Sequence, residues 1–410
     1  MSREGSIRIG QMGDLHLGCR QYGLFQRAID FYEAAMQAAN LLVQKNVDLV
    51  VVPGDIFHEA RPYPAAQRDA LSVFQVFTEK DIPVFAVRGN HDASYAWSQR
   101  QGGDELHVFE DLHKFTYLQD SYSEVGVHGT NIRLWGLGYY GKATSDMLQK
   151  MAEEHIDKLR DNSMPNVLVA HCYLDSMGIP HDITEYELNA RAFDYIALGH
   201  YHKWWANSSG SMCCTGATEH TSASEWSEAD RSVAVVTLRK TRGKWAPEIE
   251  RLSFKVRPKV SRVLNLGSTN SASASRQALE VLKELDLKDY MVRLELAGSL
   301  ADTTNPIDTR AIAGQARNAF HVDVIDNLSL SQTPLQETAS HDEVIREVLI
   351  KGLNVPAKEA PRWSSLVEEM KSILSEKWDT EAQDVTMKTL YRFVEREQVP
   401  RKEKGRKKRA

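Results

Sequence analysis

The chain has 410 residues, of which 42% are hydrophobic and 26% are charged, and its formal net charge is −6. This length allows roughly two or three domains, and the composition is ordinary for a globular protein. No apolar run approaches about 18 residues, which argues against a transmembrane helix. The sequence also begins without the apolar core of a secretory signal peptide. We therefore expect a cytoplasmic protein.

The cysteines agree with a reducing environment. The four cysteines are Cys19, Cys172, Cys213 and Cys214, and no two of them form a C-x-x-C pair. A disulfide framework or a zinc site built from cysteines is therefore not predicted.

From Ile7 to about Leu238, short apolar runs alternate with segments of helical spacing. The helical segments lie at 27–44 and 63–79. The apolar runs are nearly continuous, each ends at Gly, His or Asp, and they lie at 47–55, 82–92, 166–171 and 194–200. Such runs are typical of strands buried on both faces of a sheet that helices cover. We therefore predict an α/β domain over residues 1–235.

A second, smaller α+β region is predicted over residues 236–330. After an alternating strand-like opening come a helix, a strand at 290–298, a helix near 308–320 and a strand at 321–328. The small-residue stretch GSTNSASAS at 267–275 is predicted to be a loop inside this region, because strands flank it on both sides.

The last region, residues 331–410, is predicted to be helical. Ser340 and Glu343 form a capping-box pattern. An amphipathic stripe follows, made of Leu366, Val367, Met370, Ile373 and Leu374. Such a stripe packs internally or docks on a partner. Residues 401–410 carry seven Lys or Arg and one Glu, a tail suited to a phosphate backbone, although such runs are more often simply solvated.

Polar side chains gather where the predicted strands of the first domain end. The motifs GDLH, GDIFH, GNHD, AH and GHYH supply Asp14, His16, Asp55, His58, Asn90, His91, Asp92, His171, His200 and His202. Sites in α/β sheets assemble at the carboxyl ends of strands. Asp, Asn and His are ligands suited to Mn²⁺, Fe or Zn²⁺. One strand-end histidine alone is more often structural, but the five segments together favour a metal site.

The number of candidate ligands favours two ions. One ion needs three or four protein ligands, whereas the motifs offer more, which suits two ions about 3.5–4 Å apart that share a carboxylate. In the extended D-x-H and H-x-H segments, side chains two residues apart point the same way. Glycine, which permits sharp turns and close approach, precedes four of the candidates, Asp14, Asp55, Asn90 and His200.

The order D-x-H, GD-x-x-H, GNHD, H and GH-x-H resembles the calcineurin-like metallophosphoesterase superfamily. More narrowly, GDIFHEARPYPAAQRDAL, GHYHK and CCTGATEHTSASEW resemble the SbcD/Mre-eleven family of DNA double-strand-break repair nucleases. The resemblance implies a four-layer αββα sandwich over 1–235, a capping and DNA-binding domain over 236–330, and a partner-binding helical segment over 331–410. It is specific over the first domain and weaker beyond.

The resemblance also implies roles for individual residues. Asp14, His16 and His202 match ligands of one metal, and Asn90, His171 and His200 match ligands of the other. Asp55 matches the bridging carboxylate. His91 matches a histidine that faces the scissile phosphate, and His58 one that lies near the substrate phosphate. For Asp92 we expect an orienting contact with the ring of His91.

The function implied is a metal-dependent DNA exo- or endonuclease with two divalent ions, Mn²⁺ first and Fe, Zn²⁺ or Mg²⁺ as alternatives. The implied partners are DNA ends and an SMC-like coiled-coil ATPase of the SbcC type. The resemblance also implies a homodimer whose interface is formed by helices at 63–79 and 94–106.

Two other readings stay open at this point. One is a metallophosphoesterase acting on nucleotides, cyclic nucleotides or other non-DNA phosphoesters, and the other is a DNA-end-binding subunit without activity. Trp204 and Trp205, which follow the GHYHK motif, either stack on bases or pack beneath the sheet.

Overall fold

A computed structural model describes residues 5–93, 105–189, 192–227, 230–285, 287–301, 307–316, 318–330, 345–346, 349–350 and 358–375. The chain divides into two compact units. The first extends to Val260 and includes Asp289–Met291, and the second holds the remainder. None of the helices within these ranges has both the length and the apolar character needed to cross a membrane.

The first unit contains two six-stranded sheets. One has the order β12-β11-β1-β2-β3-β4. Its strands are β1 (Ser6–Gln11), β2 (Leu49–Pro53), β3 (Val84–Val87), β4 (Phe115–Tyr117), β11 (Arg231–Thr241) and β12 (Lys244–Phe254). From β1 to β4 the strands are parallel, and β11 runs antiparallel to β1 and to β12.

The other sheet has the order β5-β6-β7-β8-β10-β9. Its strands are β5 (Tyr122–Val127), β6 (Thr130–Leu137), β7 (Asn166–His171), β8 (Tyr195–Gly199), β9 (Trp205–Ala206) and β10 (Met212–Cys214). Strands β6, β7, β8 and β10 are parallel, and β5 and β9 are the antiparallel edges.

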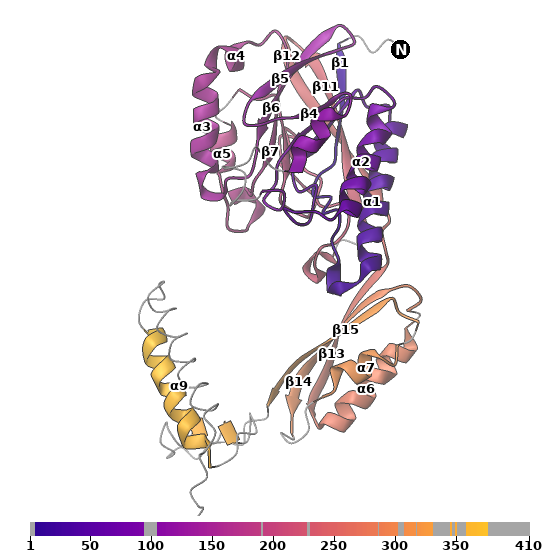
Figure 1. The fold of residues 1–410 in the computed structure, drawn as a ribbon, viewed down its shortest axis with the longest axis vertical. Helices are drawn as coiled ribbons and strands as arrows, with labels where there is room; N and C mark the ends of the chain where they lie inside the picture. The colour runs from indigo at the N-terminus through magenta and orange to yellow at the C-terminus, as the bar shows by residue number, and fades with distance from the viewer. Residues whose placement is uncertain are drawn as a thin grey trace, which may run out of the picture. The chain divides into compact units, whose positions relative to one another are not determined.

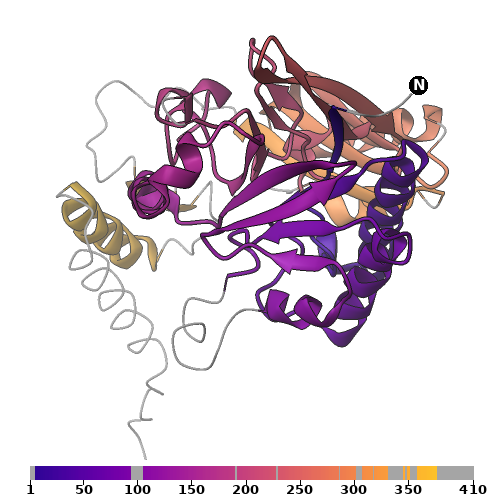
Figure 2. The same cartoon turned by 90° about the horizontal axis from the view of Figure 1, so that it is seen from above.

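Helices cover the two outer faces of this pair of sheets. Helices α1 (Phe25–Gln44) and α2 (Pro64–Thr78) lie on the side of the first sheet, and α3 (Thr144–Glu154), α4 (Ile156–Arg160) and α5 (Glu185–Asn189) lie on the other side (Figures 1 and 2). Short 3₁₀ turns occur among the connections, at Gln21–Gly23, Glu105–Asp111, Gly141–Ala143, Asp175–Met177 and Ala223–Glu225.

Three apolar cores fill the spaces between these layers. Phe31 and Phe74 belong to the core beneath α1 and α2, and Leu148 belongs to the core beneath α3. Between the sheets, Ala197 of β8 joins the middle core, while Leu198 faces the outer one. Strands buried on both faces must be apolar at successive positions. The predicted four-layer αββα architecture is therefore confirmed.

The two tryptophans that follow the GHYHK motif pack into different cores. Trp204 packs against the core between the sheets, and the guanidinium of Arg251 lies 4.8 Å from the centre of its ring. Trp205, in β9, packs against the outer core. Side chains alternate between the faces of an extended chain, so the two adjacent tryptophans pack on opposite faces of the second sheet.

The second unit has a three-stranded sheet, β13-β14-β15, with α6 and α7 beside it in Figure 1. Its elements are β13 (Lys259–Thr269), α6 (Ser271–Glu284), β14 (Met291–Leu300), α7 (Thr309–Ala313) and β15 (His321–Leu330). The predicted loop at 267–275 is wrong, because β13 continues to Thr269 and α6 starts at Ser271. The side chain of Asn270 accepts a hydrogen bond from the N–H of Ser273 at 2.8 Å, which caps the helix.

Helix α9 (Ala360–Ser375) confirms a helix in the last region. Leu366 of the predicted stripe is buried and Val367 is exposed. Several predicted features lie outside the described residues. They are the side chains of Met370, Ile373 and Leu374, the capping box at Ser340 and Glu343, the tail at 401–410 and most of the expected helix at 94–106.

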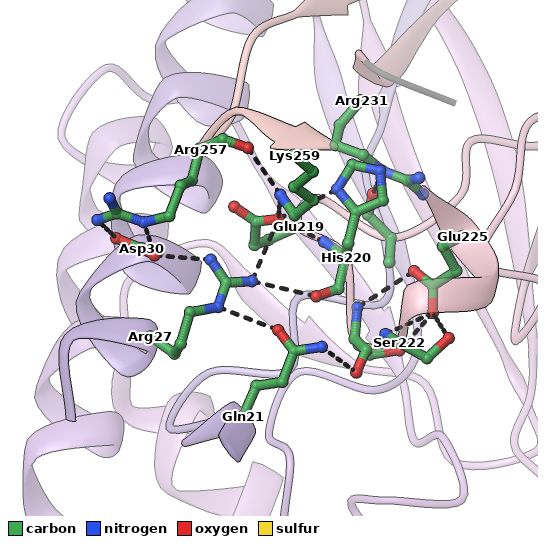
Figure 3. A network of polar contacts seen from close by, with 12 residues as sticks. Gln21, Arg27, Asp30, Glu219, His220, Ser222, Glu225, Arg231, Arg257 and Lys259 are labelled. Atoms are coloured by element: carbon green, nitrogen blue, oxygen red, sulfur yellow. Dashed lines mark hydrogen bonds and ion pairs between the residues drawn. The ribbon is translucent and has the colours of Figure 1, made fainter. Parts of the chain in front are cut away.

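A buried ion-pair cluster joins α1 to the segment before β13 (Figure 3). Asp30 accepts a hydrogen bond from Arg27 at 2.6 Å and two from Arg257 at 2.6 Å each. Glu219 Oε1 lies 2.7 Å from the ammonium of Lys259 and 3.3 Å from the guanidinium of Arg27. Because Arg27 and Glu219 are fully buried, each depends on its partners to offset desolvation.

We predict that Glu219→Gln destabilises the fold strongly, because it leaves Lys259 and Arg27 buried without their carboxylate. The expected loss in free energy of unfolding is about 3–5 kcal/mol, measured by chemical denaturation. The matched control is Glu248→Gln, which removes the exposed Glu248–Arg239 pair and should cost about 0–1 kcal/mol. Equal losses in the two variants would contradict the role of the cluster.

The difference in free energy of unfolding between wild type and Glu219→Gln should also depend on pH. Burial raises the pKa of Glu219, but His220, Lys259 and Arg27 outweigh it and hold the pKa well below the ordinary 4.5. The stabilisation is therefore complete above pH 4.5, where the unfolded carboxyl is also ionised, and is lost as the pH falls toward the folded pKa.

Candidate metal centre

The predicted site residues all lie at or just after the carboxyl ends of parallel strands. Asp14 and His16 follow β1, Asp55 and His58 follow β2, and Asn90, His91 and Asp92 follow β3. In the second sheet, His171 is the last residue of β7, and His200 and His202 follow β8. Each sheet thus presents its strand ends at the same side of the sandwich, where the two sets of side chains meet.

The backbone turns sharply at four of these residues. The φ angles of Asp14, His16, Asp55 and His200 are 50°, 45°, 50° and 83°, in the left-handed region that residues other than glycine rarely adopt. Hydrogen bonds between neighbouring loops hold these conformations. The N–H of Asp14 donates to the carbonyl of Gly54 at 3.1 Å, and that of His16 to the carbonyl of Asp55 at 3.0 Å. Such strain is typical of functional sites.

Two of the glycines are required by close packing around these residues. A Cβ atom at Gly89 would lie 2.0 Å from Oδ1 of Asp55, and one at Gly199 would lie 1.9 Å from the carbonyl oxygen of Pro53. Backbone segments therefore approach each other at the site more closely than any side chain permits.

The structure brings the predicted ligands into two groups that share one residue. Donor atoms of Asp14, His16, Asp55 and His202 lie within 4.8 Å of one another, and so do those of Asp55, His171 and His200. Oδ2 of Asp55 lies 3.6 Å from Nε2 of His16 and 3.5 Å from Nε2 of His171. Asn90 joins the second group, because its Oδ1 lies 3.0 Å from Nε2 of His171.

The hydrogen bonds of Asp55 leave one oxygen directed at these histidines. Oδ1 accepts the N–H of His91 at 2.8 Å. Oδ2 is buried and has no hydrogen-bond partner among the described residues. A buried carboxylate oxygen without a partner is costly, and a cation placed between the two groups would satisfy it.

Acceptor atoms also face each other at His171. Its Nδ1 donates to the carbonyl of Pro53 at 2.7 Å, so the neutral ring presents a lone pair at Nε2. That lone pair meets oxygens of Asn90 and Asp55, which are acceptors too. A positive charge relieves this arrangement, and a divalent ion fits it.

The pKa values agree with a site made for cations. Burial would lower the pKa of His171, but the charge of Asp55 raises it to about 9, so a proton takes the cation's place. Burial, aided by His171, lowers the pKa of His200 to about 2, which keeps that imidazole neutral. Burial also lowers the pKa of His16 well below its ordinary value. Neutral imidazoles are the form that binds metals.

His58 and His91 form a stacked pair at the edge of the first group. Their ring centres are 5.2 Å apart with an interplanar angle of 20°, and both contribute to a further group of donor atoms with His16. Nδ1 of His91 donates to the carbonyl of His58 at 2.7 Å. This bond fixes the ring and leaves Nε2 as its other polar atom.

The expected contact between Asp92 and the ring of His91 is wrong. The carboxylate of Asp92 instead accepts backbone N–H groups of Ile56 at 3.2 Å, Phe57 at 2.9 Å and Gly89 at 2.9 Å. Burial, with the charge of Asp55, raises its pKa to about 7. Asp92 thus ties the loop after β2 to the loop after β3, and the carbonyl of His58 takes the role expected of it.

Several contacts around the ligands could not be predicted from the sequence motifs. Rings of Tyr173 and Tyr139 pack against His200, with centres 3.7 Å and 5.1 Å away. The outer ring nitrogen of His202 meets Thr221 and Glu225. The family-like stretch CCTGATEHTSASEW contains both of these last residues, but no spacing rule connects them to a histidine about twenty positions earlier.

Parts of this chain are similar to known proteins. Residues 7–204 match the family model described as calcineurin-like phosphoesterase. Two curated relatives, both named DNA double-strand break repair protein Mre11, are 30% identical: one from Archaeoglobus fulgidus over 48% of this chain and 46% of its own length, and one from Methanocaldococcus jannaschii over 51% and 55%. The chain thus spans about half the length of each of these relatives.

A third relative of the same name matches over a longer stretch. The protein from Haloferax volcanii is 26% identical over 88% of this chain and 78% of its own length. Residues 7–204 are therefore similar to the calcineurin-like phosphoesterase family, and the chain is similar over most of its length to a protein named DNA double-strand break repair protein Mre11.

Proposed function

We propose that this protein is a metal-dependent phosphodiesterase that cleaves DNA and processes DNA ends in double-strand-break repair. The observation that carries the proposal is the buried Oδ2 of Asp55, which lies between two groups of Asp and His side chains and lacks a hydrogen-bond partner among the described residues. The phosphoesterase family implies divalent metal ions, and the names of the relatives support DNA as the substrate.

We assign Asp14, His16 and His202 to one ion and Asn90, His171 and His200 to the other, with Asp55 shared by both. Carboxylate, amide and imidazole donors without thiolate suit Mn²⁺, our first choice. Two divalent ions in such a site stabilise negative charge on a phosphoryl group and make a nucleophile available from water at neutral pH. The chain's own residues hold the ligand atoms in place.

His91 is assigned to the phosphate. Its Nδ1 is held by the carbonyl of His58, so Nε2 is the atom that can donate to a phosphate oxygen or to the leaving oxygen. His58 lies beside it and forms the wall near the substrate phosphate. Asp92 supports both through the backbone of the loops that carry them.

The remaining regions are assigned from the family that the sequence motifs resemble. Residues 1–235 are the nuclease domain, 236–330 cap the site and bind DNA, and 331–410 bind an SMC-like ATPase of the SbcC type through α9 and its surroundings. A homodimer formed through α2 and residues 94–106 completes the proposal. The amphipathic pattern of α9 supports a docking role.

Asp55→Ala should remove both ions, because each group of ligands loses the carboxylate that they share. We expect Mn²⁺ content, measured by elemental analysis after dialysis, to fall from two ions per chain to nearly none. Asp194→Ala is the matched control, since Asp194 lies just before β8, at the strand's opposite end, and should leave the metal content unchanged. Full occupancy in Asp55→Ala would refute the shared ligand.

His91→Ala should keep both ions and lose most hydrolysis. Loss of one acid or base typically costs roughly 10²–10⁴-fold in rate, measured with Mn²⁺ on single-stranded and linear duplex DNA. His113→Ala, at a largely exposed histidine, is the control and should cleave at the wild-type rate. A near wild-type rate for His91→Ala would contradict its assignment.

The same assay decides the substrate class. Wild-type protein that hydrolyses small phosphodiesters but leaves both DNA substrates intact would show a phosphoesterase acting on other esters, and DNA cleavage would support the proposal.

A further inference from the structure

We propose that Glu225, acting through Thr221, is a positioning residue that holds His202 in the tautomer and orientation needed to bind an ion. This inference rests on the proposed metal centre and goes beyond its ligands. Glu225 is not among the predicted site residues, and it lies in the 3₁₀ turn Ala223–Glu225, between β10 and β11.

The two ring nitrogens of His202 face different surroundings. Nε2 points into the ligand group and lies 3.0 Å from Nε2 of His16. Nδ1 lies 2.9 Å from the hydroxyl of Thr221 and 3.2 Å from Oε1 of Glu225. An ionised carboxylate only accepts hydrogen bonds, so Nδ1 carries the hydrogen and Nε2 keeps its lone pair for an ion.

Thr221 completes the connection between the ring and the carboxylate. Its hydroxyl donates to Oε1 of Glu225 at 2.6 Å, which leaves the hydroxyl oxygen free to accept from Nδ1 of His202. The direct contact and the contact through Thr221 both set the same tautomer. A carboxylate behind a metal-binding histidine also makes the imidazole a stronger ligand.

The carboxylate of Glu225 is held independently of His202. Backbone N–H groups of Thr221 and Ser222 donate to it at 3.2 Å and 3.1 Å, and the Ser222 hydroxyl lies 3.0 Å away. Glu225 is 5% exposed. The carboxylate of Glu225 is therefore held in position whether or not His202 contacts it, as a positioning group requires.

This segment is anchored in turn on the buried cluster of Arg27 and Glu219 (Figure 3). Gln21 donates to the carbonyl of Thr221 at 2.8 Å and accepts from Arg27 at 3.1 Å, and Arg27 also donates to the carbonyl of His220 at 3.1 Å. The backbone of His202 is held from the same side, because its carbonyl accepts from Arg231. The ring of this ligand thus depends on Thr221 and Glu225, and its backbone on Arg231 of β11.

The two groups of ligands differ in this support. The outer nitrogen of His171 meets the neutral carbonyl of Pro53, whereas that of His202 meets an ionised carboxylate. Loss of Glu225 should therefore weaken the ion held by Asp14, His16 and His202 and spare the ion held by Asn90, His171 and His200.

The direct test is Mn²⁺ titration of the full chain followed by calorimetry. Wild type should bind two ions, and Glu225→Ala should bind one of them roughly 10- to 100-fold more weakly, the usual effect of losing such a partner. Glu225→Gln, which still accepts a hydrogen bond, should fall between the two. Unchanged affinity at both sites in Glu225→Ala would overturn the inference.

Glu219→Gln is the matched control, because Glu219 is buried in the same segment but has no contact with His202 among the described bonds. It should lower thermal stability at least as much as Glu225→Ala does, but weaken Mn²⁺ binding by less. An equal loss of affinity in this control would mean that general loosening of the segment, and not the carboxylate, explains the effect.

Thr221→Val keeps the carboxylate and the shape of the segment, so it decides the matter if Glu225→Ala does not fold. It should weaken the same ion, by less than Glu225→Ala, and an unchanged affinity would count against the inference. In metal-free protein with ¹⁵N-labelled histidine, at a pH where the ring is neutral, NMR should show His202 with hydrogen on Nδ1 in wild type and a mixture of tautomers in the variants.

These readouts separate the inference from the function on which it rests. Two ions in wild type with no effect of Glu225→Ala would defeat the inference alone. A wild-type protein that binds no Mn²⁺ would defeat both.

Discussion

The structure is organised around one buried carboxylate. Asp55 is fully buried, one of its oxygens is held by a backbone N–H, and the other faces imidazoles from both sheets. Burial alone would raise its pKa, but His171 and His16 lower it far below the ordinary value. A charge in this position is stable only when positive charge surrounds it. The neighbouring histidines and the ions we propose are alternative ways to supply that charge.

The fold delivers this arrangement through its layers. Two sheets present their strand ends together, so loops after β1, β2 and β3 meet those after β7 and β8. Bonds between loops, such as that from His16 to the carbonyl of Asp55, and glycines that allow contact closer than a side chain permits make the loops mutually dependent. Asp92 illustrates the principle, because its carboxylate binds two backbone N–H groups of the loop after β2 and one of its own loop rather than any ligand.

Much of this could be predicted from the sequence because the signals are local. Continuous apolar runs identify strands buried on both faces, and the residues that end those runs are the ones that meet at the site. The rest depends on contacts between distant segments. Nothing near His202 in the chain indicates Glu225, and no rule assigns Trp204 and Trp205 to opposite cores before the position of β9 is known. The expected orienting role of Asp92 failed for the same reason, since the ring of His91 donates to the carbonyl of His58.

The central claim is that two ions share Asp55. Electron paramagnetic resonance of the wild-type protein loaded with Mn²⁺ tests it most directly, because ions about 3.5–4 Å apart that share a carboxylate couple magnetically. The account predicts the spectrum of a coupled Mn²⁺ pair once two equivalents are bound. The six-line spectrum of isolated Mn²⁺, unchanged from one equivalent to two, would contradict it.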